Sequence, residues 1–226
     1  MKSEDYFEKE YKISGLSSQR KYPNEELCRF LGRKKKFFKK NIKCLDVGVG
    51  GGGNLIPLID MKFQVDAIDI SETAIKLLKK KFKKVNFIKM NMTDIYSLKK
   101  KYDLVIDIFS SYSLDTISGE KFLLGVSKIL KKNGVFFSYF PSKKSDTWKK
   151  SSKKFLVDKN TLVKITNKNL PYYGNNYPFR FHSKNEYLKL LNKYGLKINY
   201  CETITKTYLN EKIKTNFLVI ECQKWR

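Results

Sequence analysis

Glycine is concentrated between residues 44 and 54, in the sequence CLDVGVGGGGN. The spacing of Gly48, Gly50 and Gly53 satisfies the G-x-G-x-x-G pattern of nucleotide-binding loops, in which the missing side chains let a ligand approach the main chain. Asp69 follows about 20 positions later, where such folds carry an acid that accepts hydrogen bonds from ribose hydroxyls. The chemistry indicated is the binding of a cofactor that contains a nucleoside.

Asp46 narrows the choice of cofactor. We expect its carboxylate to be ionised and to lie beside the ligand, because a dry sheet would penalise the charge. A pyrophosphate would be repelled there, whereas an ammonium or sulfonium group would be attracted. No Tyr-x-x-x-Lys sequence begins in the loop directly after the fourth predicted strand, so a nicotinamide oxidoreductase is the least favoured interpretation. The residues therefore indicate a cationic nucleoside.

Metal chemistry is not expected from this composition. His182 is the only histidine, and the four cysteines form no C-x-x-C pair. Zinc sites normally draw their ligands from closely spaced cysteines and histidines. We therefore predict no metal site.

The order of apolar and polar segments indicates the fold that positions these residues. From Ile42 onward, short apolar runs alternate with helix-like polar stretches, which predicts parallel strands joined by helical crossovers. Two final apolar runs separated by turn residues predict a hairpin. The expected fold class is α/β: a Rossmann-like, doubly wound, seven-stranded and mostly parallel sheet with a C-terminal antiparallel hairpin. Strands are expected at residues 42–47, 63–70, 85–90, 102–109, 134–140, 196–205 and 216–223.

Capping residues mark where the helices begin and end. Ser71 is expected to cap a helix that runs to about Lys83. Ser183 and Glu186 form a capping box for a helix that ends before Gly195. Two further helices are expected, one starting at Pro23-Asn24 and one over residues 119–132.

Two stretches lie outside this repeat and are expected to wall the binding site, because appendages carry specificity in α/β folds. Residues 1–41 form an N-terminal cap segment that includes the Tyr-rich sequence SEDYFEKEY. Residues 141–180 form an insertion, rich in lysine and aromatic residues, within a domain that spans residues 42–226. We expect this insertion to be a lid whose rings pack inward.

The formal net charge of +25 suggests an anionic partner. Only five of the 47 basic residues are arginine, whose planar fork favours phosphate and base recognition, so nucleic acid is the less favoured partner. The first ten residues are too charged for a secretory signal, and no apolar run approaches the ~20 residues of a membrane span. We expect a cytoplasmic protein without a membrane partner.

At these motifs the sequence resembles the class I S-adenosylmethionine-dependent methyltransferases, in particular the small single-domain enzymes that act on small molecules. Asp46-x-Gly48-x-Gly50-x-Gly52 is similar to their first motif, and Ala67-Ile-Asp69-Ile-Ser71 to their second-strand motif. Gly53-Asn54-Leu55 resembles the continuation seen in the tellurite-resistance-like subgroup, where Arg-Asn is commoner than Gly-Asn. The resemblance covers nearly everything from Lys43 to Gln223 and makes residues 42–226 the methyltransferase domain.

The resemblance implies that S-adenosylmethionine is the cofactor and S-adenosylhomocysteine its product. Asp69 would hold both ribose hydroxyls, Asn91 the exocyclic amine of adenine, and Arg20 the methionine carboxylate. Asn91 departs from the family, which carries Asp there, but keeps an acceptor in its amide oxygen. The implied cofactor-binding residues are Asp46, Gly48, Gly50, Gly52, Asn54, Asp69, Ile70, Asn91, Met92, Ile108, Phe109 and Arg20.

The loop after the fourth strand faces the acceptor in this family, which places Tyr112 and Ser113 on the acceptor side. Tyr112 and His182 are the catalytic candidates, with a nearby acid as a further choice, because a hydroxyl or protonated amine needs a base to take its proton. Arg180 would hold an anionic group of the acceptor. The implied substrate-binding residues are Tyr112, Ser113, Arg180 and Tyr22.

The expected enzyme transfers a methyl group to a polar small molecule, such as a sugar, a nucleotide sugar or a phosphorylated metabolite. Its main task is to hold the acceptor in line with the methyl carbon and to exclude water. Two alternatives remain open. An RNA methyltransferase would use the basic insertion, and its binding would weaken as salt rises. A non-catalytic S-adenosylmethionine-binding module would bind the cofactor and release no product.

Overall fold

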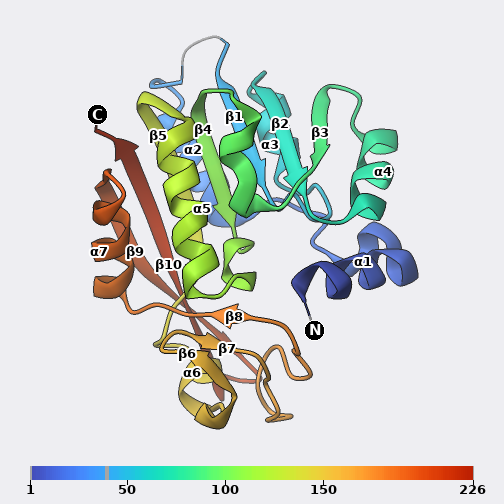
Figure 1. Cartoon of the computed structure of the whole chain (residues 1–226), viewed down its shortest axis with the longest axis vertical. Helices are drawn as coiled ribbons and strands as arrows, with labels where there is room; N and C mark the ends of the chain where they lie inside the picture. Colours follow the sequence, from blue (N-terminus) through green and yellow to red (C-terminus); the bar gives the residue numbers. More distant parts are fainter. Residues whose placement is uncertain (1, 39–40, 226) are drawn as a thin grey trace.

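The computed structural model describes residues 2–38 and 41–225. Residues 1, 39 and 40 of the expected cap segment and residue 226 of the expected domain lie outside this description. The described residues form a seven-stranded sheet and a second sheet of three short strands (Figure 1). The strands of the main sheet, in spatial order, are β3 (Val85–Lys89), β2 (Gln64–Asp69), β1 (Lys43–Val47), β4 (Tyr102–Ile108), β5 (Leu130–Pro141), β10 (Ile213–Lys224) and β9 (Leu196–Tyr208).

Strands β1 to β5 run parallel to one another, and β10 runs antiparallel to both β5 and β9. The predicted α/β class, the seven strands and the C-terminal antiparallel hairpin are therefore confirmed. Parallel strands bring their carboxyl ends to one edge of the sheet. The residues that follow β1, β2, β3 and β4 consequently lie close together.

Helices cover both faces of the main sheet. Alternate residues of β1 belong to different cores: Leu45 and Val47 pack on one face, and Cys44 on the other. The first core includes residues of α5 (Thr116–Ile129) and α7 (Lys184–Lys193), and the second includes residues of α2 (Glu25–Lys34), α3 (Leu55–Asp60) and α4 (Glu72–Lys81). Such strands, buried on both faces, are typical of doubly wound sheets.

Most predicted caps are present. Asn24 accepts a hydrogen bond from Glu26 N at 2.9 Å, and Ser71 accepts one from Ala74 N at 3.0 Å. Ser183 and Glu186 form the predicted capping box of α7. Helix α5 begins earlier than predicted, at Thr116, because the side chain of Asp115 caps it through Ser118 N at 2.8 Å.

Helix α1 (Ser3–Ser14) was not predicted as a helix, only as part of the cap segment. It lies near α4, at the carboxyl end of the sheet (Figure 1). Glu8 attaches it to the start of α4 by accepting hydrogen bonds from Ser71 Oγ and Thr73 Oγ1, both at 2.7 Å. A 3₁₀ turn, Gly15–Ser18, follows α1.

The insertion at residues 141–180 lies beyond the same end of the main sheet (Figure 1). Its three-stranded sheet is made of β6 (Leu156–Asp158), β7 (Thr161–Leu162) and β8 (Phe179–Arg180), next to the short helix α6 (Asp146–Lys150). Tyr177 of this segment packs against Tyr6 and Phe7 of α1, with ring centroids 4.5 and 5.2 Å apart. The N-terminal segment and the insertion therefore meet over the edge of the sheet.

Candidate functional site

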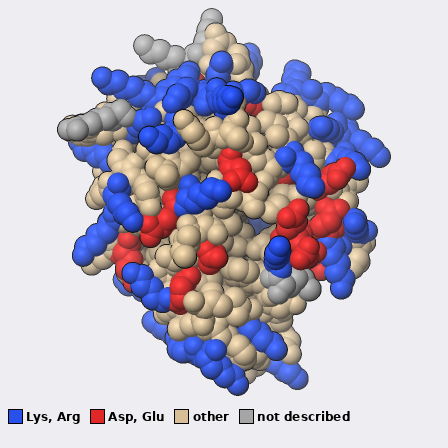
Figure 2. All heavy atoms as spheres, viewed as in Figure 1, with Lys and Arg blue, Asp and Glu red and all other residues tan. Residues whose placement is uncertain are grey.

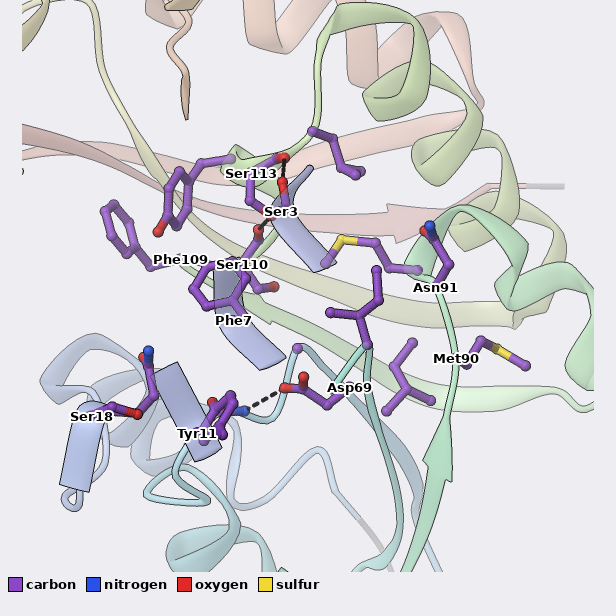
Figure 3. A pocket seen from close by; sticks show the side chains of 18 of the residues that line it. Ser3, Phe7, Tyr11, Ser18, Asp69, Met90, Asn91, Phe109, Ser110 and Ser113 are labelled. Atoms are coloured by element: carbon purple, nitrogen blue, oxygen red, sulfur yellow. Dashed lines mark hydrogen bonds between the residues drawn. The ribbon is translucent and has the colours of Figure 1, made fainter. Parts of the chain in front are cut away.

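A cavity of about 510 Å³ lies where the carboxyl ends of the strands meet α1 and the insertion. Figure 3 shows Asp69, Met90 and Asn91 along one side and Phe109, Ser110 and Ser113 along the other. Ten residues predicted for cofactor or substrate binding line it: Arg20, Gly48, Gly50, Asp69, Ile70, Asn91, Met92, Phe109, Tyr112 and Ser113.

The glycine loop approaches the cavity with its main chain. Gly48 and Gly50 have φ angles of +66° and +56°, which side-chain-bearing residues rarely adopt. A Cβ on Gly48 would also overlap Ser110. The N–H of Gly50 donates to Oδ2 of Asp69 at 3.0 Å. The loop after β1 is thereby tied to the end of β2.

Asp69 lies at the end of β2 with 7% of its surface exposed. Its other carboxylate oxygen accepts from Ser71 N at 2.9 Å. Burial raises the pKa of Asp69, although hydrogen bonds from backbone N–H groups oppose the shift. Each carboxylate oxygen can accept more than one hydrogen bond, so Asp69 retains capacity for two hydroxyl groups in the cavity.

Asn91 lies in the cavity, but its amide oxygen is already used. The oxygen accepts hydrogen bonds from Thr93 N at 3.0 Å and from Thr93 Oγ1 at 2.9 Å, which caps the 3₁₀ turn Met92–Leu98. The predicted hydrogen bond from an exocyclic amine to this oxygen is therefore not favoured. The amide N–H₂ of Asn91 is the group available to a ligand, and it would donate to a ring nitrogen.

A buried carboxylate holds the loop that follows β4. Asp107 Oδ1 accepts from Ser110 Oγ at 2.6 Å and from Ser111 N at 2.9 Å, and its Oδ2 accepts from Ser138 Oγ at 3.4 Å. Phe109 takes a φ of +54° in this loop. Such a conformation costs energy in a residue with a side chain and persists only where its surroundings fix it. The hydrogen bonds to Asp107 hold the residues that follow Phe109 in place, and they fix this conformation.

Tyr112 lines the cavity but is not arranged as a base. Its hydroxyl is paired with the hydroxyl of Tyr177 at 3.1 Å. Burial raises the pKa of Tyr112 well above its ordinary value, so the phenolate form is disfavoured. Its ring stacks on Phe109, with centroids 4.2 Å apart. Tyr112 is therefore placed to shape the cavity wall.

A second, smaller cavity of about 90 Å³ lies beside the first. Tyr22, Asn54 and Ile108 line this cavity only, whereas Arg20 borders both cavities. Asn54 accepts a hydrogen bond from Asn24 N at 3.0 Å. Tyr22 is 80% exposed. The structure therefore separates these three predicted residues from the main cavity.

Arg180 and His182 do not reach either cavity. The guanidinium of Arg180 is buried and donates to Asp115 O at 2.9 Å and to Ser111 O at 3.1 Å. His182 packs against Phe140 and Tyr187, and burial lowers its pKa to about 3. The structure therefore does not bring Arg180, predicted to bind the substrate, or His182, predicted as a base, to either cavity. Packing around β8 draws both side chains into the core.

Asp46 and Gly52 also lie outside both cavities. Asp46 is 1% exposed beneath the loop. Burial, together with the nearby carboxylates Asp69 and Asp107, raises its pKa to about 7. The expected ionised carboxylate beside the ligand is therefore corrected to a buried, partly protonated group. Gly52 packs against Leu78 and Phe82, so it shapes the loop from behind.

Part of the cavity wall was not predicted from the sequence. Phe7 and Tyr11 of α1 point into the cavity (Figure 3). Ser3 donates from its hydroxyl to Ser113 O at 2.8 Å and so bridges α1 to the loop after β4. The Tyr-rich N-terminal sequence was the available signal, but no local pattern identified its contact surface. The other lining residues without a prediction are Ser18, Gln19, Ile68, Met90, Ser110, Leu114 and Tyr172.

Neither a membrane-spanning helix nor a cluster of metal-ligating groups occurs in the described residues. None of the helices within residues 2–38 and 41–225 has the length and apolar character needed to cross a bilayer. The same residues contain no group of three or more His, Cys, Asp or Glu side chains that could hold a metal ion.

Comparisons with known proteins agree with this geometry. Residues 44–134 match the family described as a methyltransferase domain. The ubiquinone biosynthesis O-methyltransferase of Pelagibacter ubique (strain HTCC1062) is 35% identical over 102 residues, which cover 43% of this chain and 41% of that protein. The match thus spans about two fifths of the length of this curated relative.

Solved structures share the fold at low sequence identity. The 1,6-didemethyltoxoflavin-N1-methyltransferase of Burkholderia thailandensis, solved with 1,6-didemethyltoxoflavin and S-adenosylhomocysteine, is 13% identical, with a TM-score of 0.69, covering 99% of this chain and 87% of that chain. TehB from Haemophilus influenzae is 16% identical, with a TM-score of 0.63, covering 98% of this chain and 66% of that chain. These matches confirm the fold expected from the sequence.

Proposed function

We propose that this chain, which has the fold and the methyltransferase domain of the class I S-adenosylmethionine-dependent methyltransferases, transfers a methyl group from S-adenosylmethionine to a small molecule. The observation that carries the proposal is the main cavity. It joins the glycine loop, Asp69 and Asn91 on one side to Phe109 and Tyr112 on the other. A nucleoside and an acceptor can therefore lie side by side.

The residues present fit this cofactor better than a dinucleotide. In dinucleotide-binding folds the pyrophosphate lies against the N-terminus of the helix that follows the glycine loop. Here the main chain of Arg20 and Tyr22 packs on Gly51 and Gly53, and a Cβ on either glycine would be closer than 3.0 Å to it. The cavity that the described residues leave at that place measures about 90 Å³. This packing supports a cofactor without a pyrophosphate.

S-adenosylmethionine supplies a methyl group on a sulfonium, which is already a good leaving group. Asp69 would accept hydrogen bonds from the ribose hydroxyls, and Asn91 would donate to the adenine ring. Arg20 is the only cationic side chain among the described residues of the main cavity and would hold the methionine carboxylate. Phe7 and Tyr11 would exclude water from the cavity.

The proposed acceptor is a small molecule. The sequence predicts a polar or anionic acceptor, but the aromatic and apolar side chains of the cavity favour a molecule with few hydrogen-bonding groups. The curated relative is named for an O-methylation and the Burkholderia enzyme for an N-methylation.

The RNA methyltransferase alternative is less supported. Figure 2 shows Lys and Arg over many parts of the visible face, including the lower part formed by the insertion, with acidic groups between them. Among the insertion's rings, Tyr173 is exposed, but Tyr177 is buried and Tyr172 lines the cavity. Binding of single-stranded RNA normally uses several exposed rings beside basic groups. Activity on an RNA that falls steeply with salt would restore this alternative.

The first experiment is calorimetry with S-adenosylmethionine, S-adenosylhomocysteine and NAD on the purified protein. We expect both sulfur ligands to bind and NAD to be inert. If neither S-adenosylmethionine nor S-adenosylhomocysteine binds, the proposal is refuted. Saturable binding without product across a broad acceptor panel would favour the non-catalytic binding module.

A matched pair of glycine variants localises the cofactor. Gly50→Ala should lower the affinity for S-adenosylhomocysteine about tenfold or more, because a methyl group would enter the ligand's path. Gly195→Ala is the control, since Gly195 also has a positive φ, +72°, but ends α7 away from the cavity. Both variants should lose about 1 kcal/mol of stability from backbone strain. If Gly50→Ala and Gly195→Ala bound S-adenosylhomocysteine with equal affinity, the cofactor would lie elsewhere.

A further inference from the structure

The far side of the main cavity from Asp69 and Asn91 is walled by aromatic rings. Phe109, Tyr112 and Tyr172 form this wall, which we call the aromatic wall. Phe109 stacks on Tyr112 at 4.2 Å and lies 5.6 Å from Tyr172, between ring centroids. These rings come from the loop after β4 and from the insertion. They give the acceptor a flat apolar surface.

The serine hydroxyl groups near this wall already have acceptors. Ser3 Oγ donates to Ser113 O at 2.8 Å, and Ser113 Oγ donates to Ser110 O at 2.9 Å. Ser110 Oγ is 2.6 Å from both Val47 O and Asp107 Oδ1. A sugar bound here would find few partners for its own hydroxyls, and unpaired buried polar groups are costly.

The charges around the cavity oppose an anionic acceptor. Among the described lining residues, only Asp69 and Arg20 are charged, and Arg20 would be paired with the methionine carboxylate. Asp46 and Asp107 are buried close by, and the charge of Asp107 contributes to the raised pKa of Asp46. The carboxylates of Asp69 and Asp107, with the partly protonated Asp46 and one cation, make the site unfavourable for a further negative charge and favourable for a positive one.

Apart from Asp69, which would hold the ribose, the described lining residues of the cavity include no side chain suited to removing a proton from the acceptor. Burial raises the pKa of both Tyr112 and Tyr172. His182 lies in the core, outside the described lining. A suitable acceptor must therefore carry a free lone pair before it binds.

We infer that the acceptor is a planar heteroaromatic compound that is methylated on a neutral ring nitrogen. The inference rests on the proposed function. The nitrogen lone pair forms the new bond to the methyl carbon while the carbon–sulfur bond breaks and its electron pair stays on sulfur. The positive charge passes from sulfur to nitrogen, and no proton is released. The faces of the aromatic wall and the nearby carboxylates stabilise the cationic product.

The test measures the melting temperature of the protein saturated with S-adenosylhomocysteine, to which four probes are added singly. Quinoline is the neutral acceptor and N-methylquinolinium the product cation, whereas 1-naphthoate is a planar anion and glucose 6-phosphate a polar anionic sugar. We expect the two quinoline compounds to raise the melting temperature and the two anions to leave it unchanged.

Variants at neighbouring tyrosines tie the effect to the wall. Tyr172→Leu should weaken quinoline binding about tenfold, because it removes a ring face, whereas Tyr172→Phe should retain it. Tyr173→Leu is the matched control, since Tyr173 is the next residue but is 52% exposed and does not line the cavity. These variants should bind S-adenosylhomocysteine as the unchanged protein does.

Three outcomes would overturn the inference. The first is an anion that stabilises the loaded protein as much as quinoline, the second is no stabilisation by any probe, and the third is equal loss in the Tyr172→Leu and Tyr173→Leu variants. Each leaves the proposed function intact if S-adenosylhomocysteine binds. Failure of S-adenosylhomocysteine to bind would instead refute the proposed function, and this inference with it.

Discussion

The guanidinium of Arg180 occupies the space in which a side chain on Gly119 would lie. A Cβ on Gly119 would overlap Nη1 and Cζ of Arg180. The same guanidinium donates to Ser111 O and Asp115 O. Because Gly119 of α5 has no side chain, Arg180 of β8 can hold the segment between β4 and α5 in place. This segment carries Tyr112 of the aromatic wall.

Gly119→Ala should lower the free energy of unfolding by about 2 kcal/mol or more, because the methyl group displaces Arg180 and breaks its two hydrogen bonds. Urea denaturation would measure the loss. Gly32→Ala is the control, since Gly32 lies in α2 and a Cβ there would have no described neighbour within 4 Å. That variant should gain up to about 1 kcal/mol from helix propensity. If Gly119→Ala and Gly32→Ala changed the free energy of unfolding equally, Arg180 would be free to move away from the added methyl group.

Asp69→Asn should weaken S-adenosylhomocysteine binding by about 1 to 3 kcal/mol, because an amide nitrogen cannot accept a ribose hydroxyl. Calorimetry is the measurement. Asp66→Asn is the control: Asp66 lies on the same strand but bonds to Tyr102 and Lys100, away from the cavity. The control should keep its affinity. An unchanged affinity for Asp69→Asn would remove Asp69 from the cofactor site.

Asp46 should make stability depend on pH. Burial raises its pKa from 3.8 to about 7, so the folded state holds a proton that the unfolded chain releases. The stabilisation is complete below about pH 4 and is lost as pH rises to about 7. Asp46→Asn cannot lose a proton, so its stability relative to the unchanged protein should rise over this range by on the order of 4 kcal/mol. Urea denaturation at several pH values would measure it.

Asp66 should change stability with pH in the opposite direction to Asp46. Burial alone would raise its pKa, but hydrogen bonds from Tyr102, Lys100 and Asn86 outweigh burial and lower it. The stability that Asp66 contributes is present at neutral pH and is lost as pH falls through its lowered pKa. If the Asp46 and Asp66 variants gave the same pH trend, the assigned burial of Asp46 would be wrong.

His182→Phe should preserve both turnover and S-adenosylhomocysteine affinity. Both ring nitrogens of His182 are buried without a hydrogen-bond partner among the described residues, whereas its ring packs against Phe140 and Tyr187. Replacing it with an apolar ring should leave the free energy of unfolding unchanged or raise it by about 1 kcal/mol. Loss of turnover in a stable variant that still binds S-adenosylhomocysteine would return His182 to the catalytic candidates.

The cofactor side of the cavity could be predicted because it depends on local pattern. Alternating strands and helices place the ends of β1, β2 and β3 at one edge, so Gly48, Gly50, Asp69 and Asn91 meet wherever this fold forms. Asp46 shows the limit of that reasoning. Its position on the strand was predicted, but its protonation depends on how completely neighbouring strands and two further carboxylates surround it.

The acceptor side was decided by contacts between distant segments. Ser3 meets Ser113 across 110 positions of sequence, and Tyr172 reaches Phe109 from the insertion. Arg180 and His182 looked like site residues, but core packing drew them inward. The sequence by itself determined the sheet, the glycine loop and the acid at the end of β2. Only the tertiary structure decided which rings wall the acceptor side, because side-chain burial depends on long-range packing that no local spacing encodes.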